Sequence, residues 1–338
     1  MPNILIIGGA GYIGSHVNLL LGERKYSTMV LDNLSNGHEQ AVLCGEFIFG
    51  DMGDELLLAN IFRRFSIDVV MHFSAYSIVE ESVSSPLKYY RNNIANTLNL
   101  LEVMIEHGVK KIVFSSTAAV YGEPMYVPID EDHQTNPTNP YGKTKLAIEN
   151  MLKDSDRAYD LRYVSLRYFN AAGSDKKGRI GEWHNPETHL IPRILAIAKI
   201  IKNGVTVGED TEDTNVKIYG TDYNTPDGTC VRDYIHVNDL AEAHIMAVDH
   251  LRNGGESRTY NLGSGGGYTV REVIEKVKQV VGIDLPVSES PRRSGDPARL
   301  VASVKKISQE WNWRPTYDLT EIIETAWRWE TKLDSING

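Results

Sequence analysis

The chain has 338 residues, of which 41% are hydrophobic and 24% charged, and its formal net charge is −10. This length suits two domains, or one large domain with an appended lobe, and the composition supports a sizeable core. The acidic balance argues against a nucleic-acid surface, which would show a basic patch. Two cysteines, Cys44 and Cys230, indicate a reducing compartment without a disulfide framework. With neither a signal sequence nor an apolar stretch of about 18 residues, we expect a cytoplasmic protein with no membrane or nucleic-acid partner.

The N-terminal segment combines a strand, a glycine turn and a helix. Behind an apolar run at residues 4–7, glycines recur three apart at Gly8, Gly11 and Gly14, and the apolar residues that follow recur at helical spacing. Residues 9–14 also satisfy the Gly-x-Gly-x-x-Gly fingerprint, in which glycine permits a tight turn and close backbone approach to a pyrophosphate. The phosphates would sit at the positive N-terminus of the helix.

The next strand, at residues 29–31, ends on Asp32. A carboxylate at this position accepts hydrogen bonds from the adenosine ribose and repels a 2′-phosphate, which favours NAD over NADP. Further strands and helices then alternate along the chain. We predict strands at 46–50, 68–73, 111–116 and 161–168, and helices at 56–65, 86–107 and 141–153. This alternation predicts an α/β protein with a Rossmann-type, doubly wound parallel sheet.

From Asn170 onward the pattern changes, and we expect a smaller, mixed α/β C-terminal lobe. The boundary divides the chain into a cofactor-binding domain at 1–170, with a return segment near 230–263, and a second domain at 171–338. Within the second part we predict a loop at 171–187, helices at 190–202 and 269–281, a solvated acidic loop at 209–213, strands at 216–219 and 260–262, and a compact tail that contains Trp311, Trp313, Trp327 and Trp329.

Two further patterns carry chemistry. Tyr141 and Lys145 are four residues apart, so a helix places the phenol and the ammonium on one face. A cation there favours the phenolate, and Tyr141 could then act as a base below its ordinary pKa of about 10. The strand at 111–116 runs into the hydroxyl residues Ser115, Ser116 and Thr117, at the carboxyl end where ligands of open α/β sheets lie.

With these motifs in order, the chain resembles the extended short-chain dehydrogenases/reductases and, among them, the UDP-glucose 4-epimerases. The resemblance runs from Gly8 to about Trp329. It rests on the segments Gly8–His16, Leu31–Leu34, Tyr89–Asn93, Phe114–Gly122, Tyr141–Lys145, Leu166–Asn170, Val231–His236, Tyr260–Gly263 and Arg292–Asp296.

The resemblance implies that C4 of a UDP-hexose is inverted by transient oxidation. Tyr141 would take the proton of the 4′-hydroxyl while NAD accepts the C4 hydride, and the 4-keto sugar would turn over before the hydride returns. Lys145 would hold the cofactor ribose and, with the nicotinamide charge, lower the pKa of Tyr141. Thr117, where many members carry serine, would bind the 4′-oxygen and relay its proton.

The same resemblance implies the residues of the two binding sites. Those around NAD would be Gly8, Gly11, Tyr12, Ile13, Gly14, Asp32, Asn33, Ser35, Asn36, Gly37, Asp51, Met52, Phe73, Ser74, Ala75, Ser77, Asn92, Tyr141, Lys145, Tyr168 and Phe169. Ser77 stands where some members carry a lysine, which predicts a less tightly held pyrophosphate. On the substrate side, guanidinium forks match phosphate geometry, so the diphosphate would meet Arg232 and Arg293. The remaining substrate contacts would be Thr117, Tyr141, Asn170, His189, Leu190, Lys217, Ile218, Tyr219, Asp296 and Leu300.

Several alternatives stay open at this point. A 4,6-dehydratase would carry Asp-Glu after its active-site threonine, where this chain has Ala118 and Ala119. A UDP-glucuronate 4-epimerase needs only one cation near C6, and a non-catalytic NAD-sensing scaffold would keep the glycine loop alone. Leu300 stands where some members have a bulky tyrosine, so UDP-GlcNAc and UDP-GalNAc could also be substrates. We expect no metal site, because His184 and His189 are five apart on a loop, and we expect a homodimer through helices 86–107 and 141–153.

Overall fold

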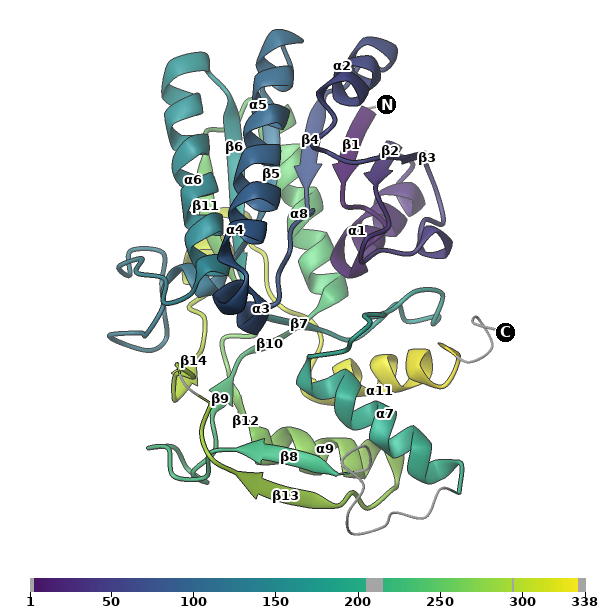
Figure 1. The fold of residues 1–338 in the computed structure, drawn as a ribbon, viewed down its shortest axis with the longest axis vertical. Helices are drawn as coiled ribbons and strands as arrows, with labels where there is room; N and C mark the ends of the chain where they lie inside the picture. The colour runs from purple at the N-terminus through teal and green to yellow at the C-terminus, as the bar shows by residue number, and fades with distance from the viewer. Residues whose placement is uncertain (1–2, 205–214, 294, 334–338) are drawn as a thin grey trace.

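The computed structural model describes residues 3–204, 215–293 and 295–333, and a seven-stranded sheet forms its centre (Figure 1). Every neighbouring pair of strands in this sheet is parallel. Their order across the sheet is β11 (Arg258–Leu262), β6 (Arg162–Tyr168), β5 (Lys111–Thr117), β4 (Val69–His72), β1 (Asn3–Ile7), β2 (Ser27–Asp32) and β3 (Glu46–Phe49). The predicted doubly wound sheet is therefore confirmed.

The apolar run of β1 is buried on both faces of the sheet. Ile4 and Ile6 belong to one hydrophobic cluster, together with residues of helices α1 (Tyr12–Glu23) and α8 (Val237–Arg252). Leu5 and Ile7 belong to a second cluster, formed with α2 (Glu55–Arg64), α5 (Asn96–Glu106) and α6 (Pro140–Tyr159). Successive strand residues point to opposite faces, so a continuous apolar run is what a parallel strand between two helical layers requires.

The predicted helix at 86–107 is a series of helical segments. It comprises α4 (Pro86–Tyr89), a π-helical segment (Tyr90–Ala95) and α5, and a short helix, α3 (Val79–Ser84), precedes it. The widened turn carries Asn92 and Asn93. Leu98 is 46% exposed, whereas Leu101 and Met104 are buried, so Leu98 does not join them in the core.

The remaining elements lie beyond the carboxyl ends of the sheet strands (Figure 1). Three helices pack together there around one hydrophobic cluster: α7 (Leu190–Lys202), α9 (Val270–Val281) and α11 (Leu319–Glu330). Small sheets accompany them: β7 (Asn170–Ala172) with β10 (Tyr234–His236), β9 (Val231–Arg232) between β12 (Tyr268–Thr269) and β14 (Arg299–Leu300), and β8 (Val216–Tyr219) with β13 (Val287–Ser290). The described elements also include α10 (Lys305–Trp311) and 3-10 turns at Glu39–Ala41 and Ala118–Val120.

Two long-range features depart from or extend the sequence expectations. The predicted return strand is β11, which pairs with β6 at the edge of the main sheet. Helix α8 was not predicted, and it packs against α1 on the sheet. Trp313 joins the core cluster of the sheet and Trp311 packs against it, so the prediction that the tryptophan-rich tail completes the smaller lobe is wrong for these two residues.

The predicted acidic loop at 209–213 lies outside the described residues. Within the described residues, none of the helices combines the length and the apolar character needed to cross a bilayer.

Candidate active site

The glycine loop is shaped by contacts at two of its three glycines. Gly8 has a φ of +78°, and a Cβ there would lie 2.5 Å from the backbone nitrogen of Ser74. A Cβ on Gly14 would lie 2.4 Å from the carbonyl oxygen of Gly8. Gly11 differs, because its Cβ would meet only that same oxygen, at 3.5 Å. Packing within the chain therefore does not require glycine at position 11. A ligand that approaches the N-terminus of α1 would require it, because a side chain there would occupy the same space.

A cavity of about 260 Å³ opens at the carboxyl ends of the central strands. The carboxylate of Asp32, at the end of β2, accepts from the backbone N–H groups of Ala10 and Leu34, each at 2.9 Å. Burial raises the pKa of Asp32 from its ordinary value. Most of the residues that line this cavity were predicted to hold NAD, namely Gly8, Asp32, Asn33, Asp51, Met52, Ser74 and Asn92.

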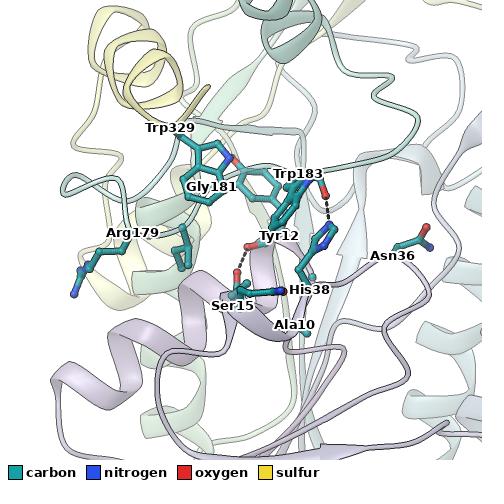
Figure 2. A pocket seen from close by; sticks show the side chains of 13 residues that line it. Ala10, Tyr12, Ser15, Asn36, His38, Arg179, Gly181, Trp183 and Trp329 are labelled. Carbon is teal, nitrogen blue, oxygen red and sulfur yellow. Dashed lines mark hydrogen bonds between the residues drawn. The ribbon is translucent and has the colours of Figure 1, made fainter. Parts of the chain in front are cut away.

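A second hollow, of about 400 Å³, lies between the glycine loop and the segment at 179–183 (Figure 2). The ring of His38 stacks on Trp183 at 3.6 Å between centroids, and His38 Nε2 lies 3.1 Å from the Trp183 carbonyl oxygen. Tyr12 donates its hydroxyl proton to the carbonyl oxygen of Gly173 at 2.6 Å. A segment from beyond the sheet therefore covers the glycine loop. Asn36 lines this hollow, whereas Gly37 packs tightly against Ala10.

The three predicted catalytic residues meet at the carboxyl end of β5. Asn139 caps α6 by accepting from the N–H of Gly142 at 2.9 Å, and Pro140 occupies the first turn, which places Tyr141 at the start of the helix. The hydroxyl groups of Tyr141 and Thr117 form a hydrogen bond. Lys145 donates from Nζ to the carbonyl oxygen of Ser115 at 2.8 Å, so its ammonium is fixed against the end of the strand that carries Thr117.

The structure corrects the expected charge state of Tyr141 in the protein chain. Burial raises the pKa of Tyr141 to about 12, and the hydrogen bond from Thr117 offsets only part of that rise. Burial also lowers the pKa of Lys145 to about 7, although the charge of Glu149 opposes the change. A depressed pKa at Tyr141 is therefore wrong for the chain alone, because burial raises the pKa more than Thr117 lowers it.

A buried ion pair that the sequence analysis missed supports Lys145. Glu149 is fully buried and receives two hydrogen bonds from Arg167, at 2.9 Å from Nε and 2.6 Å from Nη2. Ser116, in β5, donates to the same carboxylate at 2.6 Å. The signal was present, because Glu149 follows Lys145 by four residues and thus shares its helix face.

Asn93 is a second residue that the sequence analysis missed. Its buried side chain accepts from the N–H of Tyr76 at 2.9 Å and donates to the Tyr76 carbonyl oxygen and the Thr144 hydroxyl, each at 3.0 Å. It thereby ties the loop after β4 to α6. A buried asparagine in a π-helical turn has no short-range sequence signature, which is why it was overlooked.

The predicted residues on the nicotinamide side have mixed environments. The Tyr168 hydroxyl is hydrogen-bonded to Ser115, and Phe169 is buried among residues that include Leu300. Phe73 packs against His244 of α8 at 4.9 Å between ring centroids, while Ser77 is exposed. Of the other predicted residues, Ile13 packs against the sheet core and Ser35 donates its N–H to Asn33; Ala75 lies in the loop after β4.

The predicted substrate residues gather on β8, β9, β14 and the adjoining loop. Leu300 pairs with Arg232 in the β14–β9 register, and Arg232 Nη2 lies 3.0 Å from Asp296 Oδ1. The Arg293 guanidinium lies 3.9 Å above the centroid of the Tyr219 ring. Arg232, Arg293 and Asp296, which were predicted to contact the phosphates and the ribose, thus lie near one another.

Other predicted substrate residues are placed differently. The side chain of Ile218 is 1% exposed and belongs to a core cluster, so the prediction that it flanks uracil is wrong for its side chain. Its neighbour Lys217 also lies on β8. Asn170 donates to the carbonyl oxygen of Asp233 at 2.9 Å. His189 caps the start of α7, where Leu190 is the first residue, and its Nδ1 faces Glu182.

Known proteins identify the class to which this arrangement belongs. Residues 4–263 match the NAD dependent epimerase/dehydratase family, and the chain belongs to that family. It is 53% identical to the UDP-glucose 4-epimerase of Halalkalibacterium halodurans over 96% of this chain and 95% of that protein. 

Solved structures agree over nearly the full length. The UDP-glucose 4-epimerase of Brucella ovis, solved in complex with NAD, superposes with a TM-score of 0.91 at 44% identity and covers 98% of this chain and 99% of its own. The UDP-Glc/GlcNAc 4-epimerase of Campylobacter jejuni has a TM-score of 0.83 at 40% identity and covers 98% of this chain and 100% of its own.

Proposed function

We propose that this chain is a UDP-glucose 4-epimerase, which interconverts UDP-galactose and UDP-glucose by NAD-dependent oxidation at C4 through a 4-keto sugar. The observation that carries the proposal is the meeting of Tyr141, Thr117 and Lys145 at the carboxyl end of β5, at the same edge of the sheet as the cavity that Asp32 lines. Inversion at a carbon without an acidic hydrogen needs a base, a nearby dinucleotide and a sugar site, and the family unites all three.

The residues present fit NAD as the cofactor. Gly11 leaves space at the N-terminus of α1 for a pyrophosphate, and the carboxylate of Asp32 stands where ribose hydroxyls would bind. When bound, NAD supplies the acceptor and donor of the C4 hydride. The other residues that the sequence assigned to the cofactor would complete the site, with Tyr168 and Phe169 beside the nicotinamide.

The proton chemistry falls to the chain itself. Tyr141 would take the proton from the 4′-hydroxyl and later return it, acting first as base and then as acid. Thr117, already hydrogen-bonded to the phenol, would hold the 4′-oxygen and relay the proton. Lys145 would orient the ribose through its Nζ, which Ser115 and Glu149 keep in place.

On the substrate side, Arg232 and Arg293 would bind the diphosphate. The Arg232 guanidinium lies beside Asp296, which would contact the ribose. The Arg293 guanidinium lies over the ring of Tyr219, which would contact the uracil. Leu300, half-buried on β14, is smaller than the tyrosine of some members, so we also propose that the N-acetyl group of UDP-GlcNAc fits. Conversion of UDP-GlcNAc at saturating concentration tests this extension, and its absence would refute it.

Two of the three alternatives fit the residues of the site poorly, namely a 4,6-dehydratase and an NAD-sensing scaffold. Ala118 and Ala119 form the 3-10 turn after Thr117, so the acid and base that a 4,6-dehydratase needs are not at that position. A scaffold that only senses NAD would have no use for Tyr141, Thr117 and Lys145 in contact with one strand end.

We further propose a homodimer that forms through helices 86–107 and 141–153. Apolar side chains are exposed along α3 to α5, where α6 packs beside them: Val79, Val83, Leu87, Tyr90 and Leu98. Exposed apolar side chains that lie together are typical of an interface.

We also propose a role for each part of the chain. Residues 1–170, with the return segment near 230–263, would hold NAD, and residues 171–338 would hold the nucleotide sugar. The free state of both cysteines supports the further proposal that the protein acts in the cytoplasm.

One experiment tests the main proposal. Purified protein is incubated with UDP-galactose without added cofactor, and UDP-glucose is sought by NMR. We expect conversion, because the cofactor should remain bound, and we expect protein stripped of dinucleotide to be inactive until NAD is restored. Undiminished conversion by the stripped protein would overturn the proposed chemistry.

A further inference from the structure

Four side chains of the loop between β7 and α7 converge on one point. Glu182, His184, Glu187 and His189 each offer one donor atom, and these four atoms lie within 4.8 Å of one another. The sequence argument against a metal considered only the two histidines and their spacing of five. In the folded loop, two carboxylates from the same segment join them, which changes the chemistry available there.

The distances between these donors suit a small tetrahedral cation. His184 Nδ1 lies 3.3 Å from Glu182 Oε1 and 3.4 Å from Glu187 Oε2, and His189 Nδ1 lies 3.4 Å from Glu187 Oε1. Zinc bonds to nitrogen and oxygen of about 2.0–2.2 Å place tetrahedral neighbours roughly 3.3–3.5 Å apart. Only the contact between His189 Nδ1 and Glu182 Oε1, at 2.6 Å, is shorter and would have to open.

Two of these donors are buried without a hydrogen-bond partner. Oε1 of Glu182 and Nδ1 of His184 are shielded from solvent and have no partner in hydrogen-bonding geometry, although the other charged groups of the cluster are close. Glu182 as a whole is only 7% exposed. Glu187 is held differently, because its Oε1 accepts from the N–H groups of Thr188 and His189, both at 2.7 Å. The buried Oε1 of Glu182 thus faces two imidazole nitrogens without hydrogen-bonding geometry to either, an arrangement that a bound cation between them would satisfy.

We propose that Glu182, His184, Glu187 and His189 form a binding site for a divalent transition metal, with Zn²⁺ the ion that best matches the donor set and its spacing. Two carboxylates and two neutral imidazoles supply two negative charges, so one Zn²⁺ makes the cluster neutral. Without a metal, the same neutrality requires two protons.

The position of the site gives it a structural consequence. Glu182 and His184 flank Trp183, whose ring stacks on His38 beside the glycine loop (Figure 2). The ring of His184 also lies 6.2 Å from that of Tyr12. A metal at this point would fix the segment that covers the loop, so its removal should loosen that cover. The inference does not depend on the reaction proposed above, since it concerns binding of the ion alone.

Zinc titration of tag-free, EDTA-treated, NAD-containing protein tests the proposal. We expect one Zn²⁺ per chain with a dissociation constant below about 1 µM. Isothermal titration calorimetry of the same protein measures both the stoichiometry and the affinity. Co²⁺ in place of Zn²⁺ should give the intense visible absorption of a tetrahedral site.

Matched variants assign the site. His184→Gln and Glu182→Gln should each weaken zinc binding by about 10²-fold or more, because each removes a ligand. His107→Gln, at a half-buried histidine on α5's C-terminal end, should bind zinc like the parent protein. Circular dichroism establishes that each variant is folded. Failure of the parent protein to bind zinc, or equal binding by the parent and a folded His184→Gln or Glu182→Gln variant, would overturn the assignment.

Discussion

The ion pair of Glu149 and Arg167 offers a sharp test of how α6, the helix of Tyr141 and Lys145, is held. Glu149 is fully buried, and the side chain of Arg167 is 4% exposed. Glu149→Gln keeps the acceptor for Ser116 but removes the charge and turns an NH₂ group toward Arg167 Nη2, which lies 2.6 Å from Oε2. Leaving one buried charge unpaired costs about 3–5 kcal/mol, so we expect the apparent free energy of unfolding to fall by about that amount.

Urea denaturation followed by circular dichroism measures this loss. The matched controls are Glu149→Met, Arg167→Met and the double variant Glu149→Met/Arg167→Met, in which neither charge remains. Because apolar replacement of a whole buried pair is often close to neutral, the double variant should be more stable than either single variant. A loss below about 1 kcal/mol in Glu149→Gln, or additive losses in the double variant, would refute the account of the pair.

The same variant has a kinetic signature that loss of stability alone would not produce. The charge of Glu149 raises the pKa of Lys145, which burial lowers to about 7. Removing that charge should lower the pKa of Lys145 further. The alkaline limb of the kcat profile should therefore move to lower pH in Glu149→Gln, and an unmoved limb would show that Glu149 does not act on Lys145.

Three further predictions concern the base, the sugar pocket and pH. Tyr141→Phe should retain bound NAD, seen by absorbance, yet lose at least about 10²-fold in turnover; near-parental turnover would show that Tyr141 is not the base. Leu300→Tyr should lose activity on UDP-GlcNAc while keeping most of its activity on UDP-galactose, and equal loss on both would contradict the wall assigned to this position. Burial lowers the pKa of His72 and of His236 to about 3, so the unfolded chain binds protons that the folded chain does not. Stability should therefore fall as pH drops from about 6.5 toward 3, and urea midpoints that do not fall between pH 7 and pH 5 would refute this.

Local periodicity was enough to predict the cofactor half of the fold. The glycine spacing, the apolar run before it and Asp32 at the next strand end are all short-range signals, and the structure places them at one cavity. The four-residue spacing of Tyr141 and Lys145 was equally informative about position. It was misleading about pKa, because burial depends on the strands and helices packed around the pair.

Helix α8 escaped prediction for a physical reason. Ten of its sixteen residues are buried, so it lacks one clear polar face, and it begins after His236 instead of a usual capping residue. Trp313 was misplaced because its contacts are distant in sequence, including a hydrogen bond from its ring nitrogen to the carbonyl oxygen of Asp239. The cluster around Glu182 was missed for the same reason, because a loop that folds back on itself has no sequence periodicity that would indicate the contact.

The buried polar contacts also explain how the two ends of the site keep one geometry. From the pair with Glu149, Arg167 Nη1 donates to the hydroxyl of Tyr121 at 2.9 Å, and that hydroxyl donates to Asn261 at 2.7 Å. Asn261 in turn donates to the carbonyl oxygen of Ile129 at 2.9 Å, and Ile129 bonds through its N–H to Val301, the residue after Leu300. One chain of hydrogen bonds thus links the helix of Lys145 to the end of β14, the strand that we propose faces the sugar. In the proposed reaction the sugar turns over between two hydride transfers, so the residues around it must keep their positions while it moves. A buried hydrogen-bond network in which every polar group has a partner provides such rigidity.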